Sequence, residues 1–357
     1  METNTALTDL VNVDMCTDTE ISFPEGIEYI KVHNAEADGY HFLLGASIVK
    51  FGGLWVCGYG QSLVKENDTN TRFACKYSED NCKTWSGEYV IGPIEKEYCR
   101  SHGVFYNAGK TLYAFAPRAA FGTGGNGWVY PGLVMEAYRF NESDRSWANL
   151  GVVLEDPFWP LCEPMEISGG RLLMAGLDGA PSSSSTAPAA VAIADKDNPL
   201  EWKKIVIPRP SDMGIWGEST VIDHGERLVL FARTTAGRYA VSESTDGISW
   251  SSLRYTDLAA SNTKAYGGVL SNGSRYLIYG LESRKHQLIA IGREDGSCGF
   301  VKRYYIRSGF ETEANYKFGR QWAYPYAVEE SGYLYVVYSE HKENCELAVI
   351  PIGSLRA

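Results

Sequence analysis

Six segments of this chain place a glycine in a turn before a strongly apolar strand, and they recur about 55 residues apart. A short apolar run precedes each glycine, which is typical of a β-hairpin. The segments are FGGLWVCGYG (51–60), NAGKTLYAFAPR (107–118), SGGRLLMAGLDG (168–179), DHGERLVLFAR (223–233), SNGSRYLIYG (271–280) and ESGYLYVVYS (330–339). Since a repeat of this length accommodates four short strands, the six copies predict an all-β, six-bladed β-propeller. Five blades remain the alternative if one copy is miscounted.

The composition favours the same fold class. The chain has 37 Gly, 23 Tyr and 9 Trp in 357 residues, which indicates short strands and tight turns, and no long segment has a helical period of 3.6 residues. We expect residues 1–40 to form an N-terminal approach segment that packs on the propeller. Residues 41–357 are expected to form one propeller domain.

A second repeated feature follows several of these hairpins. SEDNCKTW (78–85) and STDGISW (244–250) each carry an acidic turn residue and a closing Trp, and weaker copies occur in the same phase elsewhere. The turn carboxylate can accept hydrogen bonds from backbone amides of its own loop, and the Trp can pack between adjacent sheets. We therefore interpret these segments as elements of the fold and not as catalytic groups.

Charge and composition exclude several classes of protein. A formal net charge of −11 disfavours a general nucleic-acid binder, and no run of apolar residues is long enough to span a membrane. The eight cysteines show no CxxC pair, and the six histidines show no HExxH pair. We expect reduced thiols, no catalytic metal and no cofactor. METNTALTDL is no signal sequence, which leaves open a cytoplasmic protein or a secreted or periplasmic one whose signal was removed. The oligomeric state is not predicted.

Aligning the six units on their turn glycines brings one residue from each inner strand to the same level of the central channel. These residues are Gly45, His102, Glu163, Glu218, Tyr266 and Tyr324. Ionisable and phenolic side chains are costly in positions where a buried strand normally carries Val or Ile. Five such side chains in one ring predict a ligand site at the mouth of the channel.

Arginines near the ends of the following strands form a second ring. They are Arg118, Arg233, Arg284 and Arg320. A single arginine at a strand end is usually solvated or paired with a neighbouring blade. Several around one funnel in an acidic protein predict a local site for an anion, because planar guanidinium groups match a carboxylate.

Taken together, these segments resemble the sialidase (neuraminidase) superfamily of six-bladed propellers, from about residue 41 to the end of the chain. SEDNCKTW and STDGISW are similar to the Asp boxes of that superfamily. GESTVIDHGERLVLFAR resembles the segment with a catalytic Glu and a binding Arg, which implies Glu218 and Arg233. SRKHQLIAIGREDG resembles the segment with the next arginine, which implies Arg284. WAYPYAVEESGYLYVVYS resembles the segment with the nucleophilic tyrosine, which implies Tyr324.

Two features of the first blade complete the comparison. The resemblance implies an acid/base carboxylate in the loop GQSLVKENDTNTR, where Asp68 is the first candidate and Glu66 the second. The family's Arg-Ile-Pro arginine is absent, since this chain has HFLLGASIVKF at that place. A three-arginine clamp would then need Arg118 or Arg320. His41 and His102 lie near the vacant position and could define a different subsite.

The resemblance implies a retaining exo-glycoside hydrolase that acts on a terminal, acidic sugar of a glycan. Tyr324 would be the nucleophile, Glu218 its base and Asp68 the acid, with Arg233 and Arg284 on the substrate's acid group. Arg118, Arg320, His41, His102, Glu163 and Tyr266 are the further candidates for substrate binding. One alternative is a polysaccharide lyase or an unusual glycosidase that uses a histidine and a tyrosine. Another is a glycan-binding propeller without catalysis.

Overall fold

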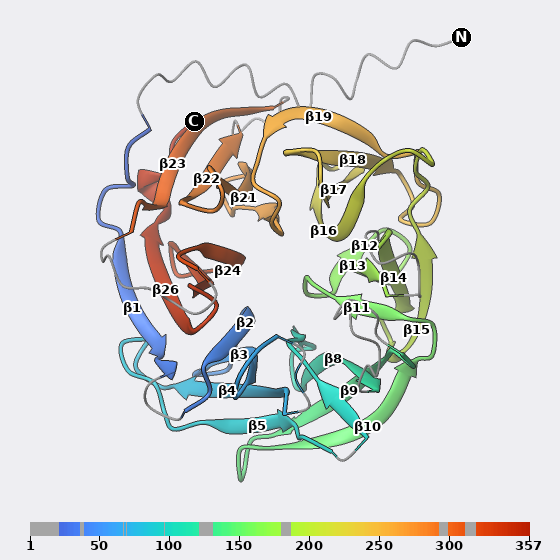
Figure 1. Ribbon diagram of the computed structural model, residues 1–357, viewed down its shortest axis with the longest axis vertical. Helices are drawn as coiled ribbons and strands as arrows, with labels where there is room; N and C mark the ends of the chain where they lie inside the picture. Colours follow the sequence, from blue (N-terminus) through green and yellow to red (C-terminus); the bar gives the residue numbers. More distant parts are fainter. Residues whose placement is uncertain are drawn as a thin grey trace.

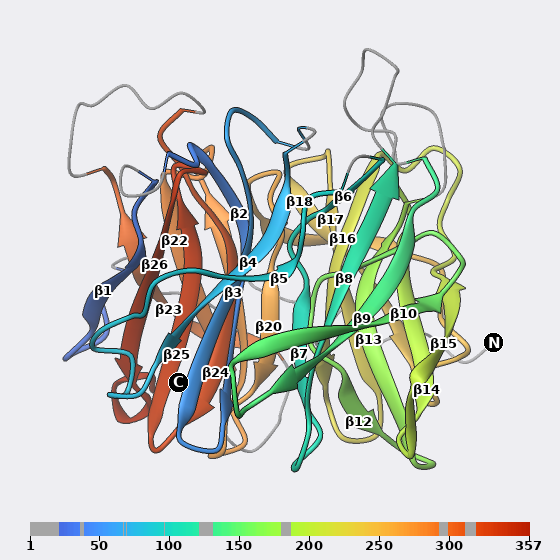
Figure 2. The same ribbon diagram turned by 90° about the horizontal axis from the view of Figure 1, so that it is seen from below.

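The computed structural model describes residues 21–35, 39–66, 68, 70–95, 97–120, 131–179, 187–292, 299–310 and 319–357. In this part of the chain, six antiparallel sheets are arranged as blades around a central axis (Figure 1). The predicted all-β, six-bladed propeller is confirmed, and the five-bladed alternative is wrong. Seen from the side, many strands run roughly along that axis (Figure 2).

Each blade is a meander whose first strand lies closest to the axis. In blades two and three this inner strand is split into two short pieces, so that five strands are counted there. The first three blades consist of β2 (Phe42–Phe51), β3 (Leu54–Ser62), β4 (Arg72–Ser78) and β5 (Tyr89–Gly92); β6 (Tyr98–Arg100), β7 (Val104–Asn107), β8 (Leu112–Ala120), β9 (Val134–Asn141) and β10 (Ser146–Leu154); and β11 (Phe158–Pro160), β12 (Met165–Ile167), β13 (Arg171–Asp178), β14 (Ala189–Asp195) and β15 (Asn198–Val206).

Blades four to six have the same plan. They consist of β16 (Ile215–Asp223), β17 (Leu228–Thr234), β18 (Arg238–Ser244) and β19 (Arg254–Ala259); β20 (Tyr266–Val269), β21 (Arg275–Leu281), β22 (His286–Gly292) and β23 (Phe300–Ser308); and β24 (Trp322–Glu330), β25 (Tyr333–Glu340), β26 (Asn344–Pro351) and β1 (Glu28–His33). A short 3-10 helix, η3 (Ile352–Ser354), follows β26.

The repeated glycines have the role that the sequence predicts. All six lie in the turn that joins the inner strand of a blade to the next strand. Five of them have a positive φ, which glycine adopts without steric cost. These are Gly109, Gly170, Gly225, Gly273 and Gly332.

Burial changes from the middle of a blade to its outer edge. All seven residues of β22 are buried, because neighbouring sheets cover both of its faces. The outer strand β15 instead mixes exposed and buried residues, as expected for a strand with one face in water.

The ring is closed by the N-terminal part of the chain. β1 pairs with β26 as the outermost strand of the sixth blade, and Figure 1 shows it beside β26. This pairing joins the two ends of the propeller in one sheet. The proposed domain boundary at residue 41 stays a prediction.

The Asp boxes fold as expected. The Asp80 carboxylate accepts hydrogen bonds from the Thr84 amide and hydroxyl, and Asp246 accepts from the amides of Ile248 and Ser249. The hydrogen bonds from Thr84 hold the pKa of Asp80 at about 2, and those from Ser249 and Ile248 do the same for Asp246. Both carboxylates are tied to their own turns, which confirms that they belong to the fold.

The described cysteines are free thiols. They are Cys57, Cys75, Cys82, Cys99, Cys162 and Cys345. This agrees with the expectation of reduced thiols. Cys16 and Cys298 lie outside the described residues.

Candidate active site

The inner strands lose their regular pairing at one level of the channel. β2, β16 and β24 have register shifts between Leu44 and Ser47, Ile215 and Ser219, and Ala323 and Tyr326. In blades two and three the break between the two inner pieces lies at the same level. Five of the six ring positions fall in these interruptions, namely Gly45, His102, Glu163, Glu218 and Tyr324. Such bulges turn side chains away from the normal alternation of a strand.

A carboxylate, a phenol and a guanidinium meet at this level. The Tyr324 hydroxyl donates to Glu218 Oε1 at 2.8 Å, and Arg233 Nη1 donates to Glu218 Oε2 at 2.6 Å. The same Arg233 nitrogen lies 3.4 Å from the Tyr324 hydroxyl oxygen. The resemblance implied these three residues from two separate segments, and the fold brings all of them into contact.

Burial and charge oppose each other in this cluster. Burial disfavours a charged Glu218, but the charge of Arg233 and the hydrogen bonds from Arg233 and Tyr324 outweigh it and hold the carboxyl pKa below its usual value. Burial, followed by the nearby Glu218 charge, raises the pKa of Tyr324 far above its usual value. The resting pair is therefore a neutral phenol on a carboxylate that is ready to accept its proton.

The backbone of Tyr324 is strained. Its φ is +56°, and among the described residues it is the only non-glycine residue inside a strand with a positive φ. A conformation of this kind costs roughly 1–3 kcal/mol and is retained where surrounding structure enforces it, often at functional sites. The strain is a second, independent mark of this position.

Two of the four candidate arginines are held together. Arg233 Nε donates to Asn262 Oδ1 at 2.5 Å, and Arg284 Nη2 donates to the Asn262 carbonyl at 2.6 Å. Arg284 Nη1 also donates to Gln321 Oε1 at 2.6 Å. Asn262 and Gln321 were not predicted from the sequence, because both lie outside the strands and belong to no recognisable motif.

The other two arginines lie elsewhere. Arg118 Nε is 3.2 Å from Glu136 Oε1, and its guanidinium covers the Tyr98 ring at 4.3 Å. Arg320 is exposed and lies over the Phe310 ring at 5.2 Å. Neither lines the pocket beside Tyr324. The structure brings together two arginines of the expected clamp.

The pocket beside Tyr324 is small, and its walls are polar and apolar in about equal parts. It has a volume of about 20 Å³, which is room for roughly one water molecule. Its polar walls are Glu66, Ser101, His102, Glu218 and Tyr324, and its apolar walls are Phe42, Leu44, Trp159, Leu161, Leu177 and Trp216. A second, open cavity of about 590 Å³ adjoins Arg284 and is lined by Asn262, Ser261 and Thr235 among others.

His102 has a place made by a glycine of the first blade. A Cβ on Gly45 would lie 2.0 Å from His102 Cγ, so that only glycine leaves room for the ring. The imidazole packs on Trp159 with a centroid distance of 5.1 Å, and its Nε2 has no hydrogen-bond partner among the described residues. Burial lowers the pKa of His102 to about 3, so that it is neutral at physiological pH. His41 is exposed at the start of β2.

The two acid/base candidates have different surroundings. Glu66 lines the pocket with Tyr324, and its Oε2 accepts a hydrogen bond from Lys342 Nζ at 2.8 Å. Asp68 does not line this pocket, and its carbonyl accepts from the Thr71 amide within the loop. Lys342, in the turn between β25 and β26, was missed because a turn lysine carries no signal in the sequence.

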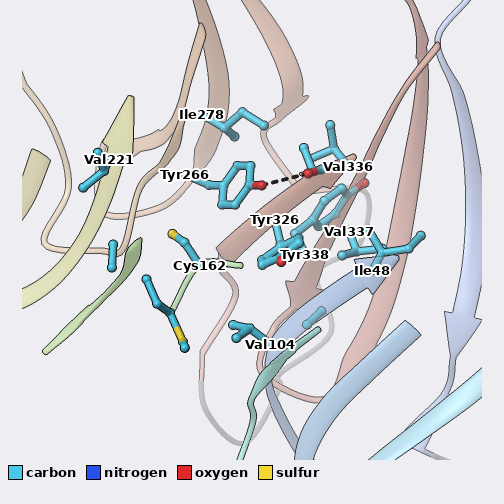
Figure 3. Close-up of a cluster of buried hydrophobic side chains, with 14 of the residues drawn as sticks. Ile48, Val104, Cys162, Val221, Tyr266, Ile278, Tyr326, Val336, Val337 and Tyr338 are labelled. Carbon is cyan, nitrogen blue, oxygen red and sulfur yellow. Dashed lines mark hydrogen bonds between the residues drawn. The ribbon is translucent and has the colours of Figure 1, made fainter. Parts of the chain in front are cut away.

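The remaining ring residues form a buried pair. The Tyr266 hydroxyl donates to Glu163 Oε1 at 2.6 Å and lies 2.9 Å from the Ala327 carbonyl. Tyr266 packs on Tyr326 with a centroid distance of 4.6 Å, and Figure 3 shows both rings near Cys162. Neither Glu163 nor Tyr266 lines the pocket of Tyr324.

The described residues lack a metal-binding group and a membrane-spanning helix. They contain no group of three or more His, Cys, Asp or Glu side chains arranged to hold a metal ion. They also contain no helix with the length and apolarity that crossing a membrane requires.

The structure can be compared with those of known proteins. In structure, the chain is similar to a protein of unknown function from Dyadobacter fermentans, with a TM-score of 0.71, 15% identity, and coverage of 91% of this chain and 99% of that one. It is also similar to an intramolecular trans-sialidase from Ruminococcus gnavus, with a TM-score of 0.71, 13% identity, and coverage of 92% and 98%. For the NanB sialidase from Streptococcus pneumoniae the TM-score is 0.69 at 13% identity, with coverage of 94% and 71%.

At these identities the likeness establishes the sialidase-like fold. A sequence comparison with curated proteins gives no match. The model of the BNR repeat-like domain family matches residues 65–336, which is most of the chain. This protein therefore belongs to the BNR repeat-like domain family.

Proposed function

We propose that this protein is a sialidase-like exo-glycoside hydrolase that acts on a terminal, acidic sugar of a glycan. The observation that carries the proposal is the 2.8 Å hydrogen bond from Tyr324 to Glu218 at the mouth of the propeller, with Arg233 on the same carboxylate. A phenol is a poor nucleophile at neutral pH unless a base removes its proton. Glu218 is within reach to do so.

Each step of the reaction has a group to perform it. The Tyr324 oxygen attacks the anomeric carbon while its proton passes to Glu218, and the bond from that carbon to the leaving oxygen breaks. A carboxylic acid of the 61–72 loop, Asp68 or Glu66, protonates the leaving oxygen. Water then attacks the anomeric carbon and gives its proton to the same loop carboxylate, while the bond to the Tyr324 oxygen breaks and Glu218 returns the proton to that oxygen. Two inversions give net retention. The position of Glu66 on the pocket wall supports it as the acid.

The arginine pair supports an anionic substrate. Arg233 and Arg284 are joined through Asn262, and Arg233 Nη1 lies 3.4 Å from the Tyr324 hydroxyl. Guanidinium groups bind carboxylates with charged hydrogen bonds. The Ruminococcus gnavus enzyme, whose structure contains oseltamivir carboxylate, is a relative by fold and supports a carbohydrate-like acid as the ligand.

One observation favours a second candidate, a glycan-binding propeller without catalysis. The cavity of about 20 Å³ beside Tyr324 is smaller than a sugar ring, so that pocket side chains must move before the ring reaches the phenol. The open cavity next to Arg284 can hold a sugar without such movement. A binding propeller needs that cavity and not the phenol.

A release assay distinguishes these functions. The purified protein is incubated with chromogenic sialosides, uronides and neutral glycosides, and absorbance near 235 nm is followed on uronate polymers. The hydrolase predicts release from an acidic glycoside and loss of release in Glu218→Gln. Absorbance near 235 nm alone would indicate the lyase. Binding of sialyl or uronyl glycans without release from any substrate would favour the binding propeller.

A further inference from the structure

A buried lysine contacts the residue that follows Tyr324 in the chain. Lys264 is 3% exposed, and its Nζ donates to the Pro325 carbonyl at 3.1 Å. The ammonium group lies 5.3 Å from the centre of the Tyr266 ring and 5.6 Å from that of Tyr326, the two rings shown in Figure 3. Its contacts therefore come from the fifth and sixth blades.

A second lysine, half-buried on β15, shows what is unusual about Lys264. Lys204 Nζ donates to the Pro157 carbonyl, also at 3.1 Å, but forms an ion pair with Asp178 at 2.9 Å as well. Among the described residues, no carboxylate lies within ion-pair distance of Lys264. Burying an unpaired cation costs free energy. The burial of Lys264 therefore indicates a role other than stability.

Its hydrogen bond meets a need created by the bulge in β24. Ala323 pairs with Ser339 and Tyr326 with Val337, which leaves Tyr324 and Pro325 outside the β24–β25 ladder. A buried carbonyl in this position needs another donor. Lys264 supplies it at the residue that follows the strained Tyr324.

The charge of Lys264 also acts on the cluster. Burial lowers the pKa of Lys264, while electrostatic interactions with Cys162 and with the Glu218 and Glu163 carboxylates oppose that change. Coupling between two charges is reciprocal, so that the lysine in turn favours the ionised form of Glu218. The lysine thus contacts the backbone next to Tyr324 and favours the charge of Glu218.

We propose that Lys264 is a positioning residue for the candidate site. By holding the Pro325 carbonyl it keeps the Tyr324 phenol on Glu218, and its charge keeps Glu218 ready to accept the proton. The kinetic consequence rests on the proposed hydrolase function. The placement of the phenol does not, and it can be measured without substrate.

The test compares Lys264→Met with Lys204→Met as the matched control. The protein is labelled with ring-carbon-13 tyrosine, and the Tyr324 signal is identified by its loss in Tyr324→Phe. Lys264→Met is expected to shift the Tyr324 signal and to lower kcat on the order of 10- to 100-fold with KM within about twofold, the effect of a misplaced reacting group. Lys204→Met should leave the Tyr324 signal and kcat unchanged.

Lys264→Gln and Lys264→Arg separate the bond from the charge. Gln keeps a donor for the Pro325 carbonyl, and Arg keeps the charge, so that at least one of them should restore part of kcat. An unchanged Tyr324 signal together with an unchanged kcat in both Lys264→Met and Lys264→Gln would overturn the proposal. If the wild type releases no sugar, the hydrolase function fails, and the Tyr324 signal alone decides the role of Lys264.

Discussion

The same three residue types form a buried cluster in three regions of this propeller. In each, a tyrosine hydroxyl and an arginine donate to one glutamate, with phenol–carboxylate distances of 2.8, 2.6 and 2.7 Å. The trios are Arg233–Glu218–Tyr324, Arg100–Glu136–Tyr138 and Arg307–Glu346–Tyr338. Their chemistry is alike, but their places in the fold are not.

Two trios take the Glu–Tyr pair from a single blade. Glu136 and Tyr138 lie two residues apart on β9, and Tyr338 is the register partner of Glu346 across β25 and β26. In the third, Glu218 and Tyr324 come from blades four and six, and both lie in interrupted pairing. A regular ladder gives two of these contacts, whereas the third needs bulges and closure of the ring. Residue types alone do not distinguish a fold element from a candidate site.

The largest expected contrast is between tyrosine variants of the trios. Tyr324→Phe should reduce kcat/KM by about 10²- to 10⁴-fold, the range for loss of a reacting proton-transfer group. Tyr138→Phe should leave kcat/KM of the folded protein unchanged and lower the free energy of unfolding by about 1–3 kcal/mol, because a buried carboxylate loses a donor. Release assays and urea unfolding measure the two quantities. Equal kcat/KM for both variants would mean that the Tyr324 trio does not differ in function from the Tyr138 trio.

Glu136 of the second trio should matter for stability and not for activity. Glu136→Gln leaves Arg100 and Arg118 without their shared carboxylate and should lower the free energy of unfolding by about 3–5 kcal/mol, while the activity of the folded protein persists. Urea unfolding at fixed pH measures the loss, and a release assay on the folded fraction serves as the control. If Glu136→Gln lost activity with an unchanged free energy of unfolding, the second trio would take part in the reaction.

Lowering the pH should destabilise the fold through His102, the neutral imidazole beside Tyr324. The unfolded chain protonates His102 near pH 6.5, but the folded chain only near pH 3. Between these values the unfolded state binds more protons, so that stability falls as the pH is lowered, by up to about 1.4 kcal/mol per pH unit from this residue. His102→Gln should flatten this slope in urea unfolding between pH 6.5 and 4. A slope unchanged by the substitution would mean that His102 titrates normally.

The smallest effect is expected at an arginine outside the clamp. Arg320→Ala should change the free energy of unfolding by less than about 0.5 kcal/mol and leave KM unchanged, because the side chain is exposed. Arg284→Ala should raise KM for an acidic glycoside about tenfold, since it removes a charged hydrogen-bond donor. Steady-state kinetics on one acidic and one neutral glycoside separate the two. A rise in KM for Arg320→Ala would place that residue in the clamp.

The fold was predictable because its signals are local. A turn glycine and an apolar strand recur in every blade, and each hairpin forms between residues close in the chain. The pairing of Glu218 with Tyr324 followed from the resemblance and not from spacing, since blade closure brings these residues together. Asn262 and Lys264 had no signal at all, because their roles depend on contacts between blades. For the same reason, the sequence could not show that Gly45 makes room for His102.

The most direct test of the central claim is to trap the nucleophile. A fluorinated acidic sugar with a good leaving group, 2,3-difluorosialic acid, slows release of a covalent intermediate, and peptide mapping by mass spectrometry then locates the attached sugar. We predict one adduct per chain on Tyr324, and none on Tyr138 or Tyr338. An adduct on any other residue, or full turnover of sialosides after treatment with no adduct on Tyr324, would contradict the account.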